Sequence, residues 1–135
     1  MPMFSKESFS KLSTCHIDLQ TLFFEVIKHR DCTIIEGHRD QAAQELAFSK
    51  GFSKLHYPYG NHNATPSNAV DVMEDPIDYT DQIKIHQFAG FVFGIAAMLK
   101  AQGKMTHSIR WGGNWSTNIN APNASFYDGA HFELF

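Results

Sequence analysis

Residues 61–71 read Asn-His-Asn-Ala-Thr-Pro-Ser-Asn-Ala-Val-Asp. This stretch changes from a polar, turn-rich segment around His62 to an apolar run from Ala69 that is interrupted by Asp71. We therefore expect a loop that leads into a strand, with the Asp71 carboxylate held on a rigid element. Imidazole and carboxylate groups both bind zinc, and a catalytic zinc usually has three protein ligands and one position left for water. The stretch predicts two ligands, and His131 is our candidate for the third.

Length and composition indicate one compact domain. The chain has 135 residues, of which 43% are hydrophobic and 13% aromatic, enough for one hydrophobic core and too few for a second domain. We expect residues 1–135 to form a single domain and a monomer. The formal net charge is -3, and the Lys and Arg residues are scattered along the chain, so we expect no nucleic-acid partner.

Two segments bear on localisation. The first ten residues, Met-Pro-Met-Phe-Ser-Lys-Glu-Ser-Phe-Ser, lack the basic start, apolar run and cleavage site of a secretory signal, which predicts synthesis in the cytoplasm. A long apolar segment over residues 81–101 has an uncharged stretch shorter than the roughly 20 residues that span a bilayer. We therefore expect no membrane insertion.

The hydrophobic periodicity predicts an α+β fold. Apolar residues at helical spacing predict helices over residues 17–29 and 81–101. Residues 5–14 are expected to form a short helix or turn, and the composition of residues 41–49, rich in Ala, Gln, Glu and Leu, predicts a further helix. Short β-branched or alternating runs predict strands over residues 33–35, 69–73, 107–111 and 131–135. Because helices and strands do not follow one another in regular parallel βαβ order, we expect a small, mainly antiparallel sheet flanked by helices.

The helix over residues 81–101 is apolar nearly all round, which predicts a central, buried element. Gly90 and Gly94 lie one turn apart in it, and each costs about 1 kcal/mol of helix propensity relative to Ala. We expect these glycines to allow another backbone segment to approach closely.

Two acidic residues near His131 are candidates for a general base. Asp128 lies three positions earlier, behind Gly129 and Ala130, so that a turn would place its carboxylate beside a metal-bound water without ligating the metal. An Asp-Gly pair is equally typical of an ordinary turn. Glu133 shares a strand face with His131 and is the competing base.

Arg39 and two tryptophans are candidates for the cleft around the metal. Arg39 follows the first expected strand, where its guanidinium could hold a substrate carboxylate or stabilise the oxyanion formed at a peptide carbonyl. The alternative is a structural ion pair with Glu36 or Asp40. We assign Trp111 and Trp115 to the cleft wall.

Four segments, in this order, resemble the zinc peptidases that cut the peptide stems of bacterial peptidoglycan: Glu-Gly-His-Arg at 36–39, the segment 62–71, Ile-Arg-Trp-Gly-Gly-Asn-Trp at 109–115, and Asp-Gly-Ala-His-Phe-Glu-Leu at 128–134. That family includes D-alanyl-D-alanine carboxypeptidases and phage L-alanyl-D-glutamate endopeptidases, and its metal site is similar to that of hedgehog signalling domains. The resemblance covers nearly the whole chain and implies a hedgehog/DD-peptidase-like fold.

The resemblance also implies a role for each candidate residue. His62, Asp71 and His131 would bind one catalytic zinc ion, Asp128 would activate the water, and Arg39 would stabilise the polarised carbonyl. The spacing departs from the common family pattern, because His62 and Asp71 lie nine positions apart rather than seven. We expect a two-residue bulge in the loop-to-strand connection between the two ligands to accommodate the extra residues.

From this resemblance we expect a zinc peptidase that hydrolyses the peptidoglycan stem peptide as a phage endolysin of the L-alanyl-D-glutamate endopeptidase type. Such an enzyme would remain in the cytoplasm until its release to the cell wall. One alternative is a D-Ala-D-Ala carboxypeptidase or dipeptidase. Another is a catalytically silent zinc-binding module in which the metal serves stability or partner binding.

Overall fold

The structure is a computed structural model and describes residues 2–135. Every helix and strand expected from the sequence is present, with ends shifted by a few residues. The helices are α1 (Lys6–Leu12), α2 (Ile17–Ile27), α3 (Gln41–Ser49) and α4 (Gln82–Ala101), and a 3-10 turn, η1, spans Asn61–Asn63. The strands are β1 (Cys32–Glu36), β2 (Ala69–Glu74), β3 (Ile109–Trp111) and β4 (His131–Leu134).

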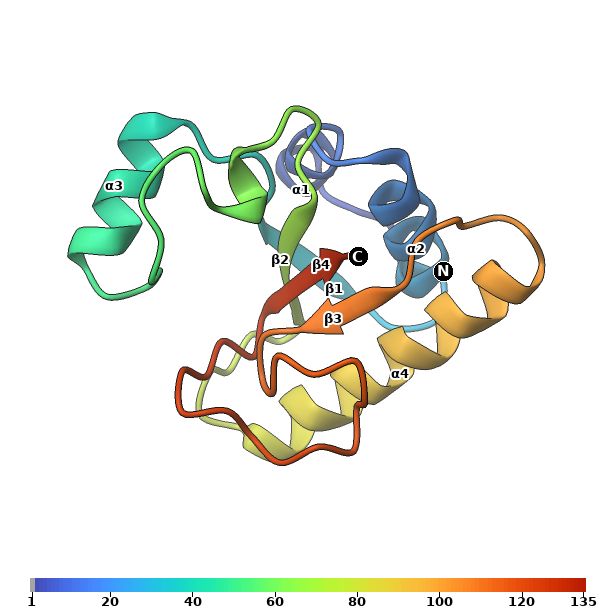
Figure 1. Cartoon of the computed structure of the whole chain (residues 1–135). Coiled ribbons are helices and arrows are strands. Elements are labelled where there is room, and N and C mark those ends of the chain that lie inside the picture. Colours follow the sequence, from blue (N-terminus) through green and yellow to red (C-terminus); the bar gives the residue numbers. More distant parts are fainter. Residues whose placement is uncertain (1) are drawn as a thin grey trace.

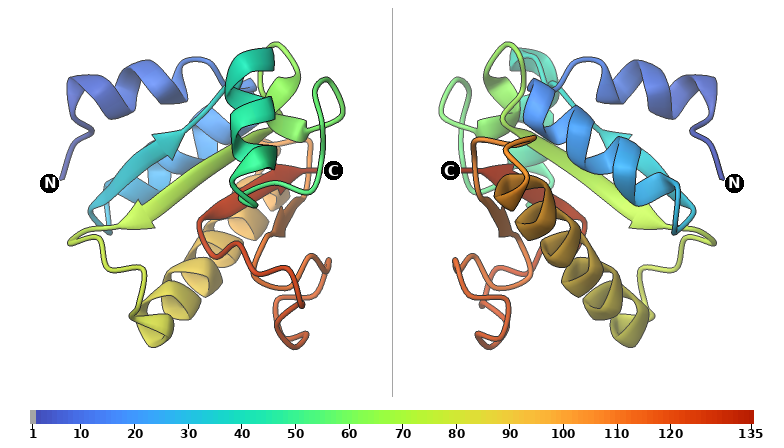
Figure 2. Two further views of the ribbon diagram at one scale, coloured as in Figure 1. Left: turned by 90° about the vertical axis from the view of Figure 1, so that its left-hand side faces the viewer. Right: turned by 90° about the vertical axis from the view of Figure 1, so that its right-hand side faces the viewer.

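The four strands form one antiparallel sheet in the order β1-β2-β4-β3 (Figure 1). Helices α2 and α4 lie against one face of this sheet, whereas α3 and the loop that follows it lie on the other side (Figure 2). The expected α+β class and the small antiparallel sheet are therefore confirmed. The order brings β2 and β4 together, although 56 residues separate the end of β2 from the start of β4.

Side-chain alternation along the strands separates the core from the opposite face of the sheet. Val70, Val72 and Phe132 are at most 1% exposed and belong to the hydrophobic core with α2 and α4. Because successive side chains of a strand point to opposite faces, Asp71 and His131 project away from this core. The same pattern that builds the core thus places the two candidate ligands on the side of α3.

Local sequence signals set the ends of the helices. The side chain of Asp40 accepts a hydrogen bond from the Ala43 amide at 2.8 Å and caps α3. At the other end of α3 the chain turns at Gly51, whose φ of 77° favours glycine. Asp81 caps α4 in the same way through the Lys84 amide.

The expected central position of α4 is wrong. Only one side of the helix packs on the core, and Ile83 on the other side is 73% exposed. An added Cβ at Gly90 or Gly94 would meet no atom within 4 Å among the described residues, so the expected close approach of another backbone segment is also wrong. By length and composition alone α4 could also cross a membrane, a test that core helices of globular proteins pass as well.

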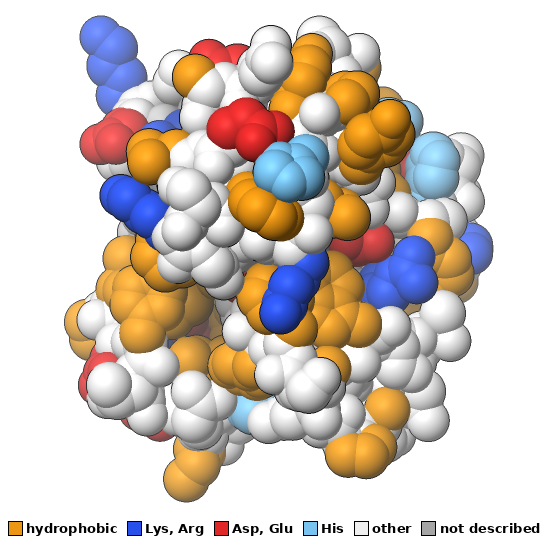
Figure 3. All heavy atoms as spheres, turned by 60° about the vertical axis from the view of Figure 1, so that its left-hand side comes forward, with side chains coloured by type: hydrophobic (Ala, Val, Ile, Leu, Met, Phe, Trp, Pro, Cys, Tyr) orange, Lys and Arg blue, Asp and Glu red, His pale blue; other side chains and the backbone are white. Residues whose placement is uncertain are grey.

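Charged side chains do not gather by sign on the face drawn in Figure 3. Acidic and basic groups are interspersed there among hydrophobic side chains. On this face, therefore, the molecule presents no extended basic area.

Candidate metal centre

The structure brings together the three side chains predicted as metal ligands. Asp71 of β2 and His131 of β4 are direct partners across the antiparallel pair, so their side chains emerge next to each other on one face. His62 comes from η1, whose position is fixed by two backbone hydrogen bonds, from the Arg39 amide to the His62 carbonyl and from the Asn68 amide to the Asn61 carbonyl. Residues 62–71 therefore fold back so that both ends of the stretch reach one point.

Three atoms of these residues form a nearly equilateral triangle. His62 Nε2 lies 3.2 Å from Asp71 Oδ1, His131 Nδ1 lies 3.3 Å from the same oxygen, and the two nitrogens are 3.2 Å apart. In a tetrahedral zinc site with bonds of 2.0–2.1 Å, neighbouring ligand atoms are about 3.3–3.4 Å apart. Asp71 Oδ1 is also buried without a hydrogen-bond partner among the described residues. The donor set and its spacing therefore fit a zinc ion.

In both imidazoles, the ring nitrogen that points away from the triangle forms a hydrogen bond with the protein. His62 Nδ1 lies 2.7 Å from the Gly37 carbonyl oxygen, which can only accept, so Nδ1 carries the proton and Nε2 offers its lone pair to the triangle. His131 Nε2 donates in the same way to Glu133 Oε1 at 2.8 Å. Arg110 lies 3.3 Å from the other oxygen of Glu133 and balances its charge.

The electrostatics of the triangle favour a positive charge. Burial disfavours the imidazolium form of His131, but its contacts with Asp71 and Glu133 outweigh burial and raise its pKa to about 9. Burial likewise opposes ionisation of Asp71, yet the charges of His62 and His131 hold the pKa of this carboxyl well below its usual range. A divalent cation would supply the same positive charge at this point.

Asp128 lies beside the triangle and outside it. Its Oδ2 is 4.0 Å from His131 Nδ1, and its side chain is 29% exposed. Burial and the neighbouring charge of Asp71 raise the pKa of Asp128 to about 6. The turn that carries Asp128 packs on Gly112, where a Cβ would collide with the Asp128 carbonyl oxygen. Glycine at this position allows the close approach.

Arg39 reaches the site from the segment after β1 and is 8% exposed. One of the alternatives from the sequence, an ion pair with Glu36, is present, with Nη2 donating to Oε2 at 2.7 Å. The guanidinium also lies 3.8 Å from Asp71 Oδ2 and borders the pocket. Arg39 therefore forms a structural ion pair and also lies at the site.

Gln44 of α3 is a site residue that the sequence did not reveal. Its side chain is fully buried, and Oε1 accepts hydrogen bonds from Arg39 at 3.0 Å and Asn63 at 3.2 Å. Its Nε2 donates to Ser53 Oγ at 2.8 Å and to the Leu55 carbonyl at 2.6 Å. No motif marks this glutamine, because Gln is ordinary on the exposed face of an Ala- and Glu-rich helix.

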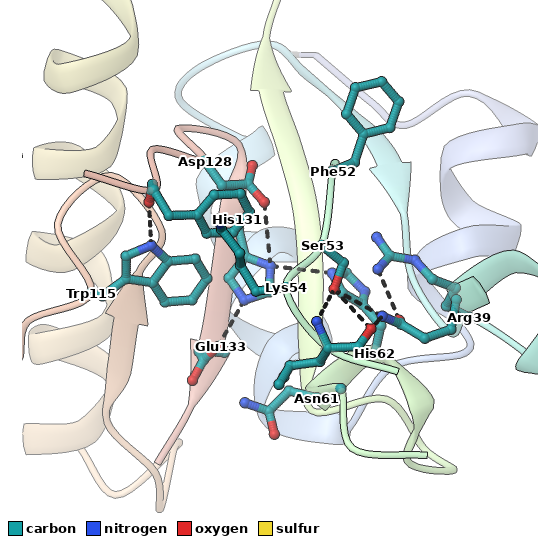
Figure 4. A pocket seen from close by; sticks show the side chains of 14 residues that line it. Arg39, Phe52, Ser53, Lys54, Asn61, His62, Trp115, Asp128, His131 and Glu133 are labelled. Atoms are coloured by element: carbon teal, nitrogen blue, oxygen red, sulfur yellow. Dashed lines mark hydrogen bonds and ion pairs between the residues drawn. The ribbon is translucent and has the colours of Figure 1, made fainter. Parts of the chain in front are cut away.

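A pocket of about 340 Å³ opens over the triangle (Figure 4). In this view His62 and His131 point toward each other, Asp128 lies beside His131, and Arg39 lies beyond His62. Trp115 lines the pocket with its ring centroid 4.9 Å from that of His131, as expected for the cleft wall. The same expectation is wrong for Trp111, which is 1% exposed and donates to the Gly129 carbonyl in the core.

Comparisons with known proteins agree with this geometry. The crystal structure of the Serratia marcescens L-Ala D-Glu endopeptidase ChiX superimposes with a TM-score of 0.73 over 98% of this chain and 90% of that chain. The two sequences are 22% identical, so this likeness shows a shared fold. No curated protein sequence matches the chain. The sequence profile of the phage L-alanyl-D-glutamate peptidases matches residues 2–135. The chain therefore belongs to the phage L-alanyl-D-glutamate peptidase family and is a peptidoglycan endopeptidase.

Proposed function

We propose that this peptidase is zinc-dependent, with His62, Asp71 and His131 as the ligands of one catalytic ion. The observation that carries the proposal is the triangle of ligand atoms, with sides of 3.2 to 3.3 Å around a buried carboxylate oxygen that has no hydrogen-bond partner in the described chain. Two imidazoles and one carboxylate are a typical set for catalytic zinc. When bound, zinc supplies Lewis acidity that polarises the scissile carbonyl and lowers the pKa of water toward about 7.

In this proposal Asp128 is the general base. Its carboxylate accepts a proton from water as the water oxygen bonds to the carbonyl carbon, and it then donates that proton to the leaving nitrogen as the C–N bond breaks. The position of Asp128 supports this role, because the residue lines the pocket and its Oδ2 lies 4.0 Å from the ligating nitrogen of His131. Arg39 stabilises the negative charge that develops on the carbonyl oxygen.

Glu133, the competing base, has a different role in this proposal. One of its oxygens is bound to His131 Nε2 at 2.8 Å and the other lies 3.3 Å from Arg110. Both oxygens are therefore occupied on the side away from the triangle. Glu133 orients His131 and increases the basicity of its ligating nitrogen, as carboxylates behind metal-bound histidines commonly do.

Mass spectrometry of digested peptidoglycan tests the proposed function. The wild type should produce stem peptides with a new glutamate amino terminus, and Asp128→Asn, which preserves side-chain size, should produce almost none. Release of free alanine without new glutamate termini would instead indicate a D-Ala-D-Ala carboxypeptidase. Equal, background-level products from both proteins would indicate a silent zinc-binding module.

We also propose that the enzyme acts as a monomeric endolysin, which is held in the cytoplasm until release to the cell wall and does not insert into the membrane. The phage family supports this role. Cells that express the protein should lyse only after their inner membrane is permeabilised. Lysis without permeabilisation would contradict the proposal, and expression of Asp128→Asn is the matched control.

A further inference from the structure

The chemistry of an L-alanyl-D-glutamate bond places a second functional group close to the scissile amide. The glutamate contributes its amino group to that amide and one of its two carboxyl groups to the rest of the stem. Its other carboxyl group stays outside the peptide chain, a few covalent bonds from the scissile nitrogen. A pocket that binds this residue therefore has to accommodate a carboxylate next to the reacting atoms.

The side of the pocket that holds the metal centre is poorly suited to bind this carboxylate. Asp128 and Glu133 both line the pocket, and Asp71 contacts His62 and His131, which line it as well. Of the residues that line it, only Arg39 and Lys54 carry a permanent positive charge. Arg39 already donates to Glu36 and Gln44 and lies beside Asp71, and in the proposed function its guanidinium stabilises the carbonyl oxygen of the scissile bond.

Lys54 differs from Arg39 in being unpaired. Its ammonium group lies 5.3 Å from the centre of the Phe126 ring and forms no ion pair with a carboxylate of residues 2–135. Phe126 stacks on Trp115 with ring centroids 6.1 Å apart, and Trp115 in turn lies beside His131. A continuous aromatic wall thus leads from a metal ligand to a free cation, and Figure 4 shows Lys54 among the side chains around this pocket.

The loop that carries Lys54 is fixed to the catalytic side of the pocket. Gln44 bonds the residues on both sides of Lys54, through Ser53 Oγ and the Leu55 carbonyl, and the same side chain accepts from Arg39. These hydrogen bonds fix the position of the Lys54 backbone relative to Arg39. The long side chain of Lys54 remains exposed and able to reach a ligand.

We propose that Lys54 is a specificity-determining residue that binds the free carboxylate of the D-glutamate residue. The proposal rests on the proposed function, because it takes the L-alanyl-D-glutamate bond as the bond that is cut. It leaves the Arg39 guanidinium for the scissile carbonyl. It also defines a substrate preference: stems with a free glutamate carboxylate are cleaved faster than stems in which that group is a carboxamide.

Two synthetic stem peptides that differ only at this group, carboxylate in one and carboxamide in the other, test the proposal. The wild type should prefer the carboxylate peptide by about tenfold in kcat/KM, the size of one charge-assisted hydrogen bond in a partly exposed site. Lys54→Met should remove this preference by raising KM for the carboxylate peptide, with kcat and the cleavage of the carboxamide peptide nearly unchanged. Lys54→Arg should restore the preference.

Lys50→Met is the matched control, because Lys50 is exposed at the end of α3 and does not line the pocket. It should retain the wild-type preference, and zinc content should be equal in all four proteins. The proposal is overturned if the wild type cleaves both peptides equally, or if Lys54→Met loses the same factor on both. A wild type that retains zinc and cleaves neither peptide would overturn the proposed function and the role of Lys54 with it.

Discussion

Two His-Asp-His clusters occur among residues 2–135, and only one of them has the geometry of a metal site. The first is the candidate metal centre of His62, Asp71 and His131. The second, which we call the α2 cluster, consists of His16, Asp18 and His107, and its potential ligand atoms also lie within 4.8 Å of one another. Residue types and proximity therefore do not distinguish the two clusters.

Three side-chain atoms of the α2 cluster, Asp18 Oδ2, His107 Nδ1 and His16 Nδ1, are engaged in hydrogen bonds. Asp18 Oδ2 accepts from the backbone amides of Thr106 and His107 at 3.1 and 2.9 Å, from the Thr106 hydroxyl at 3.0 Å and from His107 Nδ1 at 2.8 Å. His16 Nδ1 accepts from the Asp18 amide and caps α2. The cluster is therefore a clamp that ties the start of α2 to the segment before β3.

The metal centre shows the opposite distribution. Its carboxylate oxygen lacks a hydrogen-bond partner within residues 2–135, and both of its imidazoles are held from behind by Gly37 and Glu133. In a metal site the atoms that face the metal lack protein partners, and the atoms that point away from it are held by hydrogen bonds. In a structural cluster the atoms that face one another are hydrogen-bonded within the protein. A buried polar atom without a hydrogen-bond partner therefore indicates a metal site more strongly than the presence of His and Asp residues does.

Replacement of one histidine in each cluster should give the largest difference in zinc content and peptidase activity. Purified wild type should contain one equivalent of zinc, measured by elemental analysis. His62→Ala should lose both the zinc and the peptidase activity, because only two ligands remain. His107→Ala should keep one equivalent of zinc and most of the activity. Two equivalents in the wild type, or full zinc in His62→Ala, would contradict the distinction between the clusters.

Substitution of Asp128 should lower the turnover number, whereas substitution of Glu133 should mainly weaken zinc binding. Asp128→Asn should lower kcat by about 10²–10⁴-fold, the usual contribution of a general base, while the zinc content stays at one equivalent. Steady-state kinetics on a stem peptide combined with metal analysis measures both quantities. Loss of zinc from this variant would show that Asp128 is a ligand rather than the base.

Glu133→Gln should have a smaller effect, which acts through the metal. Replacement of a carboxylate behind a ligating histidine typically weakens metal affinity by about 10–100-fold. Competition with a chelator should therefore strip zinc from Glu133→Gln at lower chelator concentrations than from the wild type. At saturating zinc, kcat should recover to within about tenfold of the wild-type value if Asp128 is the base. A kcat that stays as low as that of Asp128→Asn would identify Glu133 as the base.

Much of the metal centre could be predicted from the sequence, because its residues lie at the ends of strongly patterned elements. Asp71 interrupts an apolar strand and His131 begins another, so each was recognisable as a polar group on a rigid element. The strand order was not predictable, since the pairing of β2 with β4 depends on packing between segments that are far apart in the sequence. The register of Asp71 with His131 therefore required the structure.

The remaining site residues carry no local signal. Gln44 and Lys54 lie in segments of ordinary helix and loop composition, and only the folded chain shows that one is buried and that the other borders the pocket. The position of α4 was wrong for a related reason: apolar composition predicts that a helix is buried, but the side on which it is buried depends on its neighbours. The α2 cluster joins residues 88 or more positions apart and was missed entirely.

The smallest effect that we expect concerns the stability of the α2 cluster. Burial opposes ionisation of Asp18, which is 5% exposed, but hydrogen bonds from His107 and Thr106 outweigh it and lower the pKa to about 2. A carboxyl with a lowered pKa stabilises the fold above its unfolded-state pKa and loses this effect as the pH falls toward its folded-state value. Asp18→Asn should therefore reduce the free energy of unfolding by about 1–2 kcal/mol at pH 7, a figure discounted for the exposure of His107.

Urea unfolding of the wild type and Asp18→Asn at several pH values measures this contribution. The difference should be constant from pH 7 down to about pH 5 and should shrink between about pH 4 and pH 2, because both states then bind the same proton. His16 and His107 face Asp18 in this cluster, and His107→Gln separates the contribution of the His107 imidazole from that of the carboxylate. Zinc content should not change in either variant. A difference that persists unchanged at pH 2 would show that the clamp depends on the shape of Asp18 rather than on its charge.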